Sequence, residues 1–160
     1  MYKYISKQVI LPGDFFLPFG GKLNVNNRWV ILSTMIPWEE FEAEYARNFK
    51  KTKRGGEAYN VRVALGSLII KERLGLSDYE TVNQISENPY LQYFLGFKAY
   101  TEKAPFDPSQ LTHFRKRFPE DMLNRVNERI INYSSKKDDS DDYSQNGSTG
   151  DKEVLRAQKK

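Results

Sequence analysis

The stretch that decides the fold runs from Ser77 to Phe118, SDYETVNQISENPYLQYFLGFKAYTEKAPFDPSQLTHFRKRF. It contains three signals for the start of a helix. Ser77 followed by Glu80 has the spacing of a capping box, in which the hydroxyl accepts a backbone N–H and the carboxylate reaches back. Asn88-Pro89 and Asp107-Pro108 each combine a capping side chain with a proline suited to a first helical turn. The stretch therefore predicts a series of short helices.

The last predicted helix, Asp107 to Phe118, has two distinct faces. Leu111, Phe114 and Phe118 are spaced to form one apolar stripe against a core. Because successive residues turn by about 100°, polar and basic residues occupy the opposite side and its flanks. A polar and basic helix face on a compact helical support suits insertion into the major groove of DNA. The candidate DNA-contacting residues are Ser109, Gln110, Thr112, His113, Lys116 and Arg117.

These candidates have two interpretations. As a DNA-contacting surface, Lys116 and Arg117 would bind phosphates, with guanine as an alternative target for Arg117, while Gln110 and the other polar residues would face base edges. The alternative is a solvated helix face without a ligand. Arg115 projects near the apolar stripe, so we expect it to form an internal ion pair instead of contacting bases.

A second basic segment, 47–54 with the sequence RNFKKTKR, has five basic residues and no acidic one. It leads into Gly55-Gly56, which predicts the end of a helix followed by a basic loop. Contact with DNA phosphates and simple solvation explain this composition equally well. The residues that would make the phosphate contacts are Lys50, Lys51, Lys53 and Arg54.

Two helices are predicted before this basic loop. The first, Arg28 to Met35, is capped by Asn26 or Asn27 and stops at Ile36, because a residue before proline disfavours helical angles. Pro37 opens the second helix, whose aromatic residues recur at helical spacing. We interpret them as core residues: Trp38, Phe41, Tyr45 and Phe49.

A more apolar helix is predicted from Val61 to Leu74. Its apolar residues cover much of the circumference, which is typical of a helix buried in the middle of a domain. Gly75 ends this helix, and Leu76-Ser77 turns directly into the next one. A helix, a tight glycine turn and a second short helix resemble the scaffold of helix-turn-helix folds. The second helix is predicted to bury Tyr79, Val82 and Ile85.

The chain divides into three predicted parts. Residues 1–25, rich in Gly, Pro and aromatics, form an arm packed on the helical core or, alternatively, an arm that binds a partner. Residues 26–135 form a helical DNA-binding domain. It ends in an amphipathic helix after Pro119, whose stripe completes the core or pairs with a second copy. Residues 136–160 are polar and predict a flexible linker or disordered tail. The predicted fold class is all-α: a compact multi-helix domain with a helix-turn-helix-like unit, an extended N-terminal arm and a disordered C-terminal tail.

The composition narrows the classes of function. The 160 residues provide for one domain, and 25 Lys and Arg against 21 Asp and Glu give a net charge of +4. This mild basic excess permits nucleic-acid binding. The absence of cysteine excludes disulfides and Cys-based zinc fingers. No apolar run approaches the roughly 20 residues of a membrane helix. We therefore expect a cytoplasmic protein without a membrane partner.

Most catalytic constellations cannot be assembled from this sequence. It has one histidine, His113, no cysteine and no glycine loop that would cradle phosphates. An acidic run lies in the predicted flexible tail, whereas a two-metal site needs rigidly held carboxylates; the run consists of Asp138, Asp139, Asp141 and Asp142. We expect a non-enzymatic chain that binds no metal or cofactor.

Four blocks of the sequence carry a family resemblance. They are IPWEEFEAEY (36–45), LGLSD (74–78), ENPYLQYFLGF (87–97) and DPSQLTHFRKRF (107–118). In this order and spacing, the chain from about Asn26 to Tyr133 resembles the N-terminal helical domain of bacterial insertion-sequence transposases of the IS5/IS1182 type. The resemblance implies binding to double-stranded DNA at terminal inverted repeats, a nucleoid-associated location and a DDE catalytic domain downstream. Because no apolar strand carrying the first catalytic Asp occurs before Lys160, the triad and its Mg²⁺ are expected only in such a downstream domain.

Three functional hypotheses remain. The first is a non-catalytic DNA-binding domain that recognises terminal inverted repeats in DNA transposition. The second is a free-standing helix-turn-helix transcriptional regulator that makes the same contacts. The third is a protein–protein assembly module that forms a homodimer through the Phe-rich arm and the Met122 to Tyr133 helix. The first two predict an affinity for DNA that falls steeply with salt, whereas the third predicts association that is independent of salt.

Overall fold

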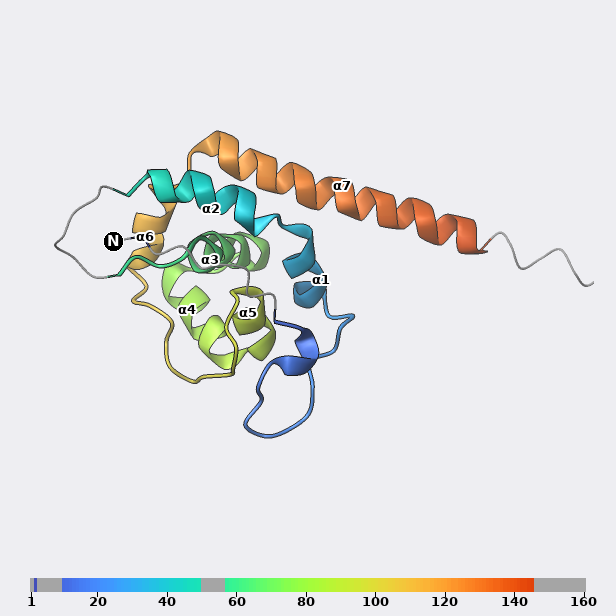
Figure 1. Cartoon of the computed structure of the whole chain (residues 1–160), viewed down its shortest axis with the longest axis horizontal. Coiled ribbons are helices and arrows are strands. Elements are labelled where there is room, and N and C mark those ends of the chain that lie inside the picture. Colours follow the sequence, from blue (N-terminus) through green and yellow to red (C-terminus); the bar gives the residue numbers. More distant parts are fainter. Residues whose placement is uncertain (1, 3–9, 50–56, 146–160) are drawn as a thin grey trace, which may run out of the picture.

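The structure, a computed structural model, describes residues 2, 10–49 and 57–145, of which 133–145 are described as backbone alone. Within these ranges every regular element is a helix (Figure 1), which confirms the predicted all-α class. A parallel β-bridge between Phe16 and Ala99 is isolated and belongs to no strand. The elements are the 3₁₀ helix η1 (Pro12–Asp14) and the helices α1 (Arg28–Met35), α2 (Trp38–Arg47), α3 (Val61–Leu74), α4 (Asp78–Glu87), α5 (Pro89–Phe94), α6 (Gln110–Arg115) and α7 (Glu120–Gln145).

Local capping explains where most of the helices begin. The side chain of Asn27 accepts a hydrogen bond from the N–H of Trp29 at 2.9 Å, and Ser77 accepts one from the N–H of Glu80 at 3.1 Å. The carboxylate of Glu80 accepts from Gln84 within its own helix. Asn88 caps α5 in the same way as Asn27 caps α1. These side chains satisfy backbone donors that would otherwise lack a partner at each helix start.

The turn between α3 and α4 is tight, as predicted. Gly75 has a φ of 63°, a left-handed conformation that a residue without Cβ adopts at little cost, and its N–H returns to the last turn of α3. Ser77 then caps α4 immediately afterwards. The short connection fixes the direction of α4 relative to α3.

Helix α3 lies at the centre of the domain (Figure 1). It packs against α2, α4 and α6, while α1 packs against α5 and α7. The prediction of a buried central helix is therefore confirmed. The apolar side chains that are most completely removed from water come from six different helices: they include Tyr45, Leu65, Ile70, Ile85, Leu91, Phe94, Leu111, Phe114 and Met122.

The N-terminal arm contributes both buried and exposed aromatics. Phe15 is buried with Leu23, Val30 and Tyr93 in a small second cluster. Phe16 exchanges backbone hydrogen bonds with the segment after α5, since its N–H donates to Lys98 and its carbonyl accepts from Tyr100. These contacts hold Phe15, Phe16 and Leu23 against the helical body, while residues 18–22 are exposed.

Two other phenylalanine side chains of the arm are exposed to solvent. The side chain of Phe16 is 64% exposed and that of Phe19 is 71% exposed, although the Phe19 ring touches that of Tyr100. The arm therefore has both a buried aromatic residue, Phe15, and two that face solvent.

Tyr79 is also exposed, at 67%, and the prediction that it is buried is wrong. The buried face of α4 consists of Thr81, Val82 and Ile85. At about 100° per residue, Tyr79 lies roughly 120° from the middle of that face. Its aromatic character suggested burial, but its angular position on the helix places it toward solvent.

Helix α7 closes the domain on the side of α1 and α2. Met122, Val126 and Ile130 are buried, as the predicted stripe requires, while Ile131 is 62% exposed. Arg125 pairs with Glu44, and Arg129 lies 3.6 Å from Glu40. These contacts join the first half of α7 to α2.

The backbone of α7 continues beyond the expected end of the domain. We predicted a flexible segment from residue 136, but the helix runs to Gln145 and its far end extends past the other helices (Figure 1). Extending an existing helix fixes one residue for each hydrogen bond gained, which costs much less than starting a new helix. Residues 146–160 of the predicted tail lie outside the described residues.

Candidate nucleic-acid interface

Helix α6 is fixed in place by its apolar side. Leu111 and Phe114 are fully buried. The ring of Phe114 makes edge contacts with Tyr59 and Phe106, with centroid distances of 5.6 and 5.2 Å. Phe118, just after the helix, stacks on Tyr45 of α2 at 5.0 Å. The predicted apolar stripe is confirmed, and it sets which side of α6 faces outward.

The helix is shorter than the predicted span of Asp107 to Phe118. Its first bonds join residues three apart, from Gln110 N–H to Asp107 O and from Leu111 N–H to Pro108 O, and the same spacing closes the end at Arg117 and Phe118. Such bonds tighten a helix terminus into 3₁₀ turns. Only the middle, Gln110–Arg115, is α-helical. The backbone nevertheless remains helical in sense across the candidate residues.

Asp107 organises the start of this turn. Its carboxylate accepts hydrogen bonds from the hydroxyl of Ser109 at 2.6 Å and from the N–H of Ser109 at 2.9 Å. These bonds hold the pKa of the Asp107 carboxyl below its usual range. Ser109 is exposed, but its hydroxyl proton is directed at Asp107, so the oxygen is left to act as an acceptor.

The candidate residues of α6 lie together on its outer side. Thr112, His113 and Lys116 are exposed, as is Ser109, while Gln110 is half-buried. The structure therefore gathers these predicted residues on one polar surface that carries the positive charge of Lys116. We call this surface the α6 face and define it by Ser109, Gln110, Thr112, His113, Lys116 and Arg117.

One edge of the α6 face rests on the end of α2. The guanidinium carbon of Arg117 lies 4.7 Å from the ring centroid of Phe49, a cation–π distance. The backbone carbonyl of Arg117 accepts a hydrogen bond from the Asn48 side chain at 2.8 Å. Arg117 is half-buried by this arrangement. Its position is thus set by packing as well as by charge.

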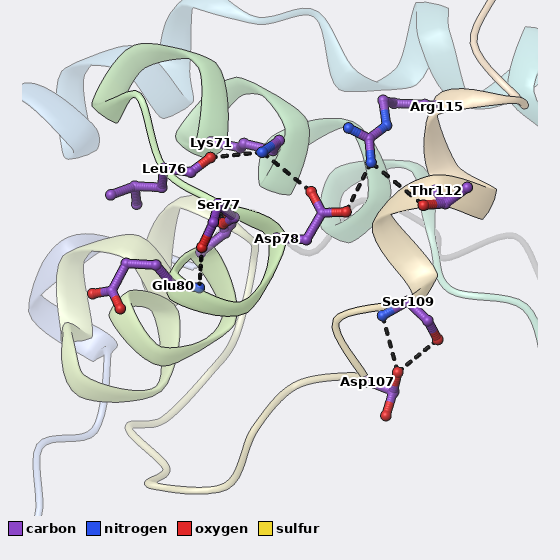
Figure 2. Close-up of polar contacts among 10 residues, drawn as sticks. Lys71, Leu76, Ser77, Asp78, Glu80, Asp107, Ser109, Thr112 and Arg115 are labelled. Carbon is purple, nitrogen blue, oxygen red and sulfur yellow. Dashed lines mark hydrogen bonds and ion pairs between the residues drawn. The ribbon is translucent and has the colours of Figure 1, made fainter.

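The other edge is joined to α3 and α4 by charged groups (Figure 2). The carboxylate of Asp78 lies 2.8 Å from Nη2 of Arg115 and 3.1 Å from Nζ of Lys71. Lys71 also donates to the carbonyl of Leu76 at 2.6 Å. The expectation that Arg115 forms an internal ion pair is confirmed. The same nitrogen of Arg115 is 3.4 Å from the hydroxyl of Thr112, which belongs to the α6 face.

A buried glutamine that the sequence patterns did not reveal holds the segment before α6. Gln92 is fully buried. Its Nε2 donates to the carbonyls of Ile85, Ser86 and Thr101, and its Oε1 accepts from the N–H of Thr101. The sequence signal was a polar residue inside the apolar run of α5. Gln92 fixes the chain that leads from α5 to α6.

The second predicted contact region is not described. Lys50, Lys51, Lys53 and Arg54 all lie outside the described residues. Across the parts of the chain that are described, no group of three or more His, Cys, Asp or Glu side chains is arranged to hold a metal ion. A search of these same residues finds no helix with the length and apolar character needed to cross a membrane.

Comparison with known proteins places the chain in a family. Residues 18–117 match the family described as Transposase domain (DUF772). The matched region contains α1 to α6 and ends at Arg117, so it includes the whole α6 face. It excludes α7, which the structure packs against α1 and α2.

One curated relative is the "Uncharacterized protein ORF8 in nfe locus" of Rhizobium meliloti, which is 35% identical over 95 residues. The alignment covers 59% of this chain and 45% of that protein, so the chain spans less than half the length of this relative. No solved structure matches the chain. Because the family match extends over more than half of the sequence, the chain belongs to the transposase domain family DUF772.

Proposed function

We propose that this chain is the DNA-binding domain of a DDE-type transposase and recognises the terminal inverted repeats of its element. Family membership supports a role in transposition. The observation that carries the DNA-binding part is the α6 face, a polar and basic surface on a helix whose opposite side is locked into the core by Leu111 and Phe114. A rigidly supported helix of this kind suits the major groove. The proposed place of action is the bacterial nucleoid.

The residues of the α6 face have separate roles in this proposal. Lys116 and Arg117 contact phosphates, which fixes the register of the helix on the duplex. Gln110 faces adenine, while Thr112 and His113 face neighbouring base edges. The chain itself supplies no catalytic group, and Mg²⁺ serves only a DDE domain elsewhere in the transposase. Recognition and cleavage are thus assigned to different parts of the protein.

Selection from a pool of random-sequence duplexes tests this proposal. We expect the chain to enrich one sequence, and we expect that sequence to match the ends of the insertion element that encodes it. The variant Gln110→Ala with Thr112→Ala loses the preference but keeps weaker, salt-dependent binding, because its phosphate contacts remain. Gln84→Ala, in α4, is the matched control and enriches the same sequence as the unaltered chain. Failure of the unaltered chain to enrich any sequence overturns the proposal. An unchanged sequence preference in the variant Gln110→Ala with Thr112→Ala also overturns it.

An assembly role is the second candidate, and the exposed aromatics of the arm favour it. Phe16 and Phe19 present large apolar surfaces to water, which is typical of a contact with another protein. In this alternative the chain forms a homodimer through the arm. Light scattering during size-exclusion chromatography tests it: a dimer that becomes a monomer on Phe16→Ser with Phe19→Ser supports assembly, and a monomer at all concentrations opposes it. A free-standing regulator would share the DNA contacts of the first proposal.

A further inference from the structure

We propose that Arg115 binds a backbone phosphate of duplex DNA while it remains paired with Asp78. The sequence pattern assigned Arg115 to an internal ion pair, and the structure confirms that pair at 2.8 Å. The pair does not use the whole guanidinium group, however, and it lies at the border of the α6 face. This inference rests on the proposed DNA-binding function and adds a contact to it.

The charges around Asp78 leave a positive excess. One carboxylate faces two cations, Lys71 at 3.1 Å and Arg115 at 2.8 Å, so the cluster carries a net charge of +1. Lys71 is largely covered, with 21% of its side chain exposed, whereas 46% of the Arg115 side chain is exposed. The excess charge is therefore most accessible at Arg115.

The guanidinium of Arg115 has unused donors. It offers five N–H groups. Contacts within the described residues involve one nitrogen, Nη2, which meets Asp78 and Thr112. In Figure 2 the dashed lines to Asp78 and Thr112 both start from this one nitrogen. A phosphate oxygen accepts hydrogen bonds from arginine with good geometry, because the planar group presents its donors in a fixed fork.

Arg115 is placed to reach one of the two phosphate backbones that border the major groove. Arg115 and Arg117 are two residues apart, so at about 100° per residue they project from roughly opposite edges of α6. Between these edges lie Thr112, His113 and Lys116. A helix in a major groove about 12 Å wide meets base edges with its central face and the two phosphate backbones with its two sides. Arg115 thus contacts the DNA phosphate backbone on one side of the groove, and Arg117 contacts the backbone on the other side.

Asp78 is a positioning residue in this arrangement. It is the first residue of α4, and its carboxylate orients the guanidinium beside Thr112. An arginine held in one orientation loses less side-chain entropy on binding than a mobile one. We therefore expect the loss of this carboxylate to weaken DNA binding, even though it removes a negative charge.

The slope of log K against log salt for a mixed-sequence duplex tests the contact. Neutralising one phosphate contributes about 0.9 to this slope. Arg115→Gln is expected to lower the slope by about that amount, and Arg115→Lys, which keeps the charge, restores it. Asp78→Asn weakens binding several-fold and leaves the slope unchanged. Arg129→Gln is the matched control, because Arg129 is another exposed arginine with an acidic partner. The slope measured for Arg129→Gln is expected to equal that of the unaltered chain.

Three results overturn the inference. They are a slope for Arg115→Gln equal to that of the unaltered chain, an equal drop for Arg129→Gln, or tighter binding by Asp78→Asn. Thermal unfolding of each variant shows that it is folded, and Arg115→Lys provides the charge-preserving comparison if Arg115→Gln is unstable. If the unaltered chain fails to bind any duplex at low salt, the proposed function itself fails. If it binds and depends on Lys116 but not on Arg115, only this inference fails.

Discussion

The carboxylate of Asp78 joins the first residue of α4 to Arg115, the last residue of α6, across 37 positions of sequence. The same carboxylate lies 3.1 Å from Lys71 in α3. Three helices therefore meet at one side chain, on the border of the α6 face (Figure 2). The pair is partly exposed, with 46% of the Arg115 side chain and 30% of the Asp78 side chain accessible. It orients α6 more than it stabilises the whole fold.

Replacement of Asp78 by Asn is expected to cost a modest amount of stability. Partly exposed ion pairs contribute about 0.2–1 kcal/mol, so we expect the free energy of unfolding to fall by about 0.5–1 kcal/mol. Urea unfolding followed by circular dichroism measures the change. Glu40→Gln is the control, because Glu40 also lies in a first helical turn but its partner Arg129 is 3.6 Å away and 60% exposed. An equal loss in the two variants would contradict a specific role for Asp78.

Replacement of Gln92 by Leu is expected to be much more damaging. The amide of Gln92 is fully buried and makes four hydrogen bonds to Ile85, Ser86 and Thr101. The substitution leaves the partly buried N–H and carbonyl of Thr101 and the buried carbonyl of Ile85 without this partner, so we expect a loss of about 2–4 kcal/mol in unfolding free energy. Gln84→Leu serves as the comparison, since its amide contacts Glu80 on the same helix, and we expect a change within about 0.5 kcal/mol. Near-equal stability of the two variants would refute the anchoring role of Gln92.

Gly96 ends α5 in a conformation that other residues avoid. Its φ is 84°, and an added Cβ would lie 2.9 Å from Cδ of Arg62. Arg62 cannot easily give way, because its Nε and Nη2 donate to the carbonyls of Phe94 and Tyr93 at 2.8 and 3.0 Å. Burial lowers the pKa of Arg62 to about 10, which still leaves it charged at neutral pH.

We therefore expect Gly96→Ala to lower the unfolding free energy by about 1–3 kcal/mol. The matched variant is Gly13→Ala, in which the added Cβ would meet nothing closer than 3.9 Å. That substitution is expected to be neutral or slightly stabilising, because alanine restricts the unfolded chain. Chemical unfolding of the two variants side by side measures the difference. A Gly96→Ala protein as stable as the Gly13→Ala protein would show that the turn is not constrained.

Stability is expected to fall at alkaline pH because of buried tyrosines. Burial raises the pKa of the Tyr45 phenol, and the nearby Arg117 opposes part of this rise. Burial and the adjacent Glu42 also raise the pKa of Tyr2. Above about pH 10 the unfolded chain loses protons that the folded chain keeps, so the contribution is complete below that pH and is lost as the pH rises.

The variant Tyr45→Phe removes one of these groups. Its unfolding free energy should therefore fall less steeply than that of the unaltered chain between about pH 9 and about pH 11. Tyr79→Phe is the control, because that ring is 67% exposed. Parallel pH curves for the unaltered chain and Tyr45→Phe would contradict the effect of burial.

Helix boundaries were the most predictable part of the fold. The predicted spans of α1 and α3 and the predicted start of α4 coincide with the structure, because these helix ends depend on local side chains, such as Ser77 and Gly75. The apolar stripe of α6 was also predictable from spacing alone. In each case the information lies within one or two helical turns of the residue concerned.

What spacing could not predict depends on distant parts of the chain. Gln92 is buried because the segment at Thr101 folds back onto it. Phe15 is buried and Phe16 exposed because the arm runs beside the residues after α5. The partner of Arg115 was predictable as acidic but not as Asp78, since the pair joins two helices that only the tertiary fold brings together.

The measurement that tests the central claim most directly is a fluorescence-anisotropy titration of duplex DNA at two salt concentrations. The unaltered chain is compared with Lys116→Ala combined with Arg117→Ala, and with Arg125→Ala combined with Arg129→Ala, which removes the same charge from α7. We expect the unaltered chain and the α7 variant to bind with an affinity that falls steeply with salt, and we expect the α6 variant to lose most of its binding. Equal binding by the α6 variant and the unaltered chain, or no binding by the unaltered chain at low salt, would contradict the assignment of the α6 face to DNA.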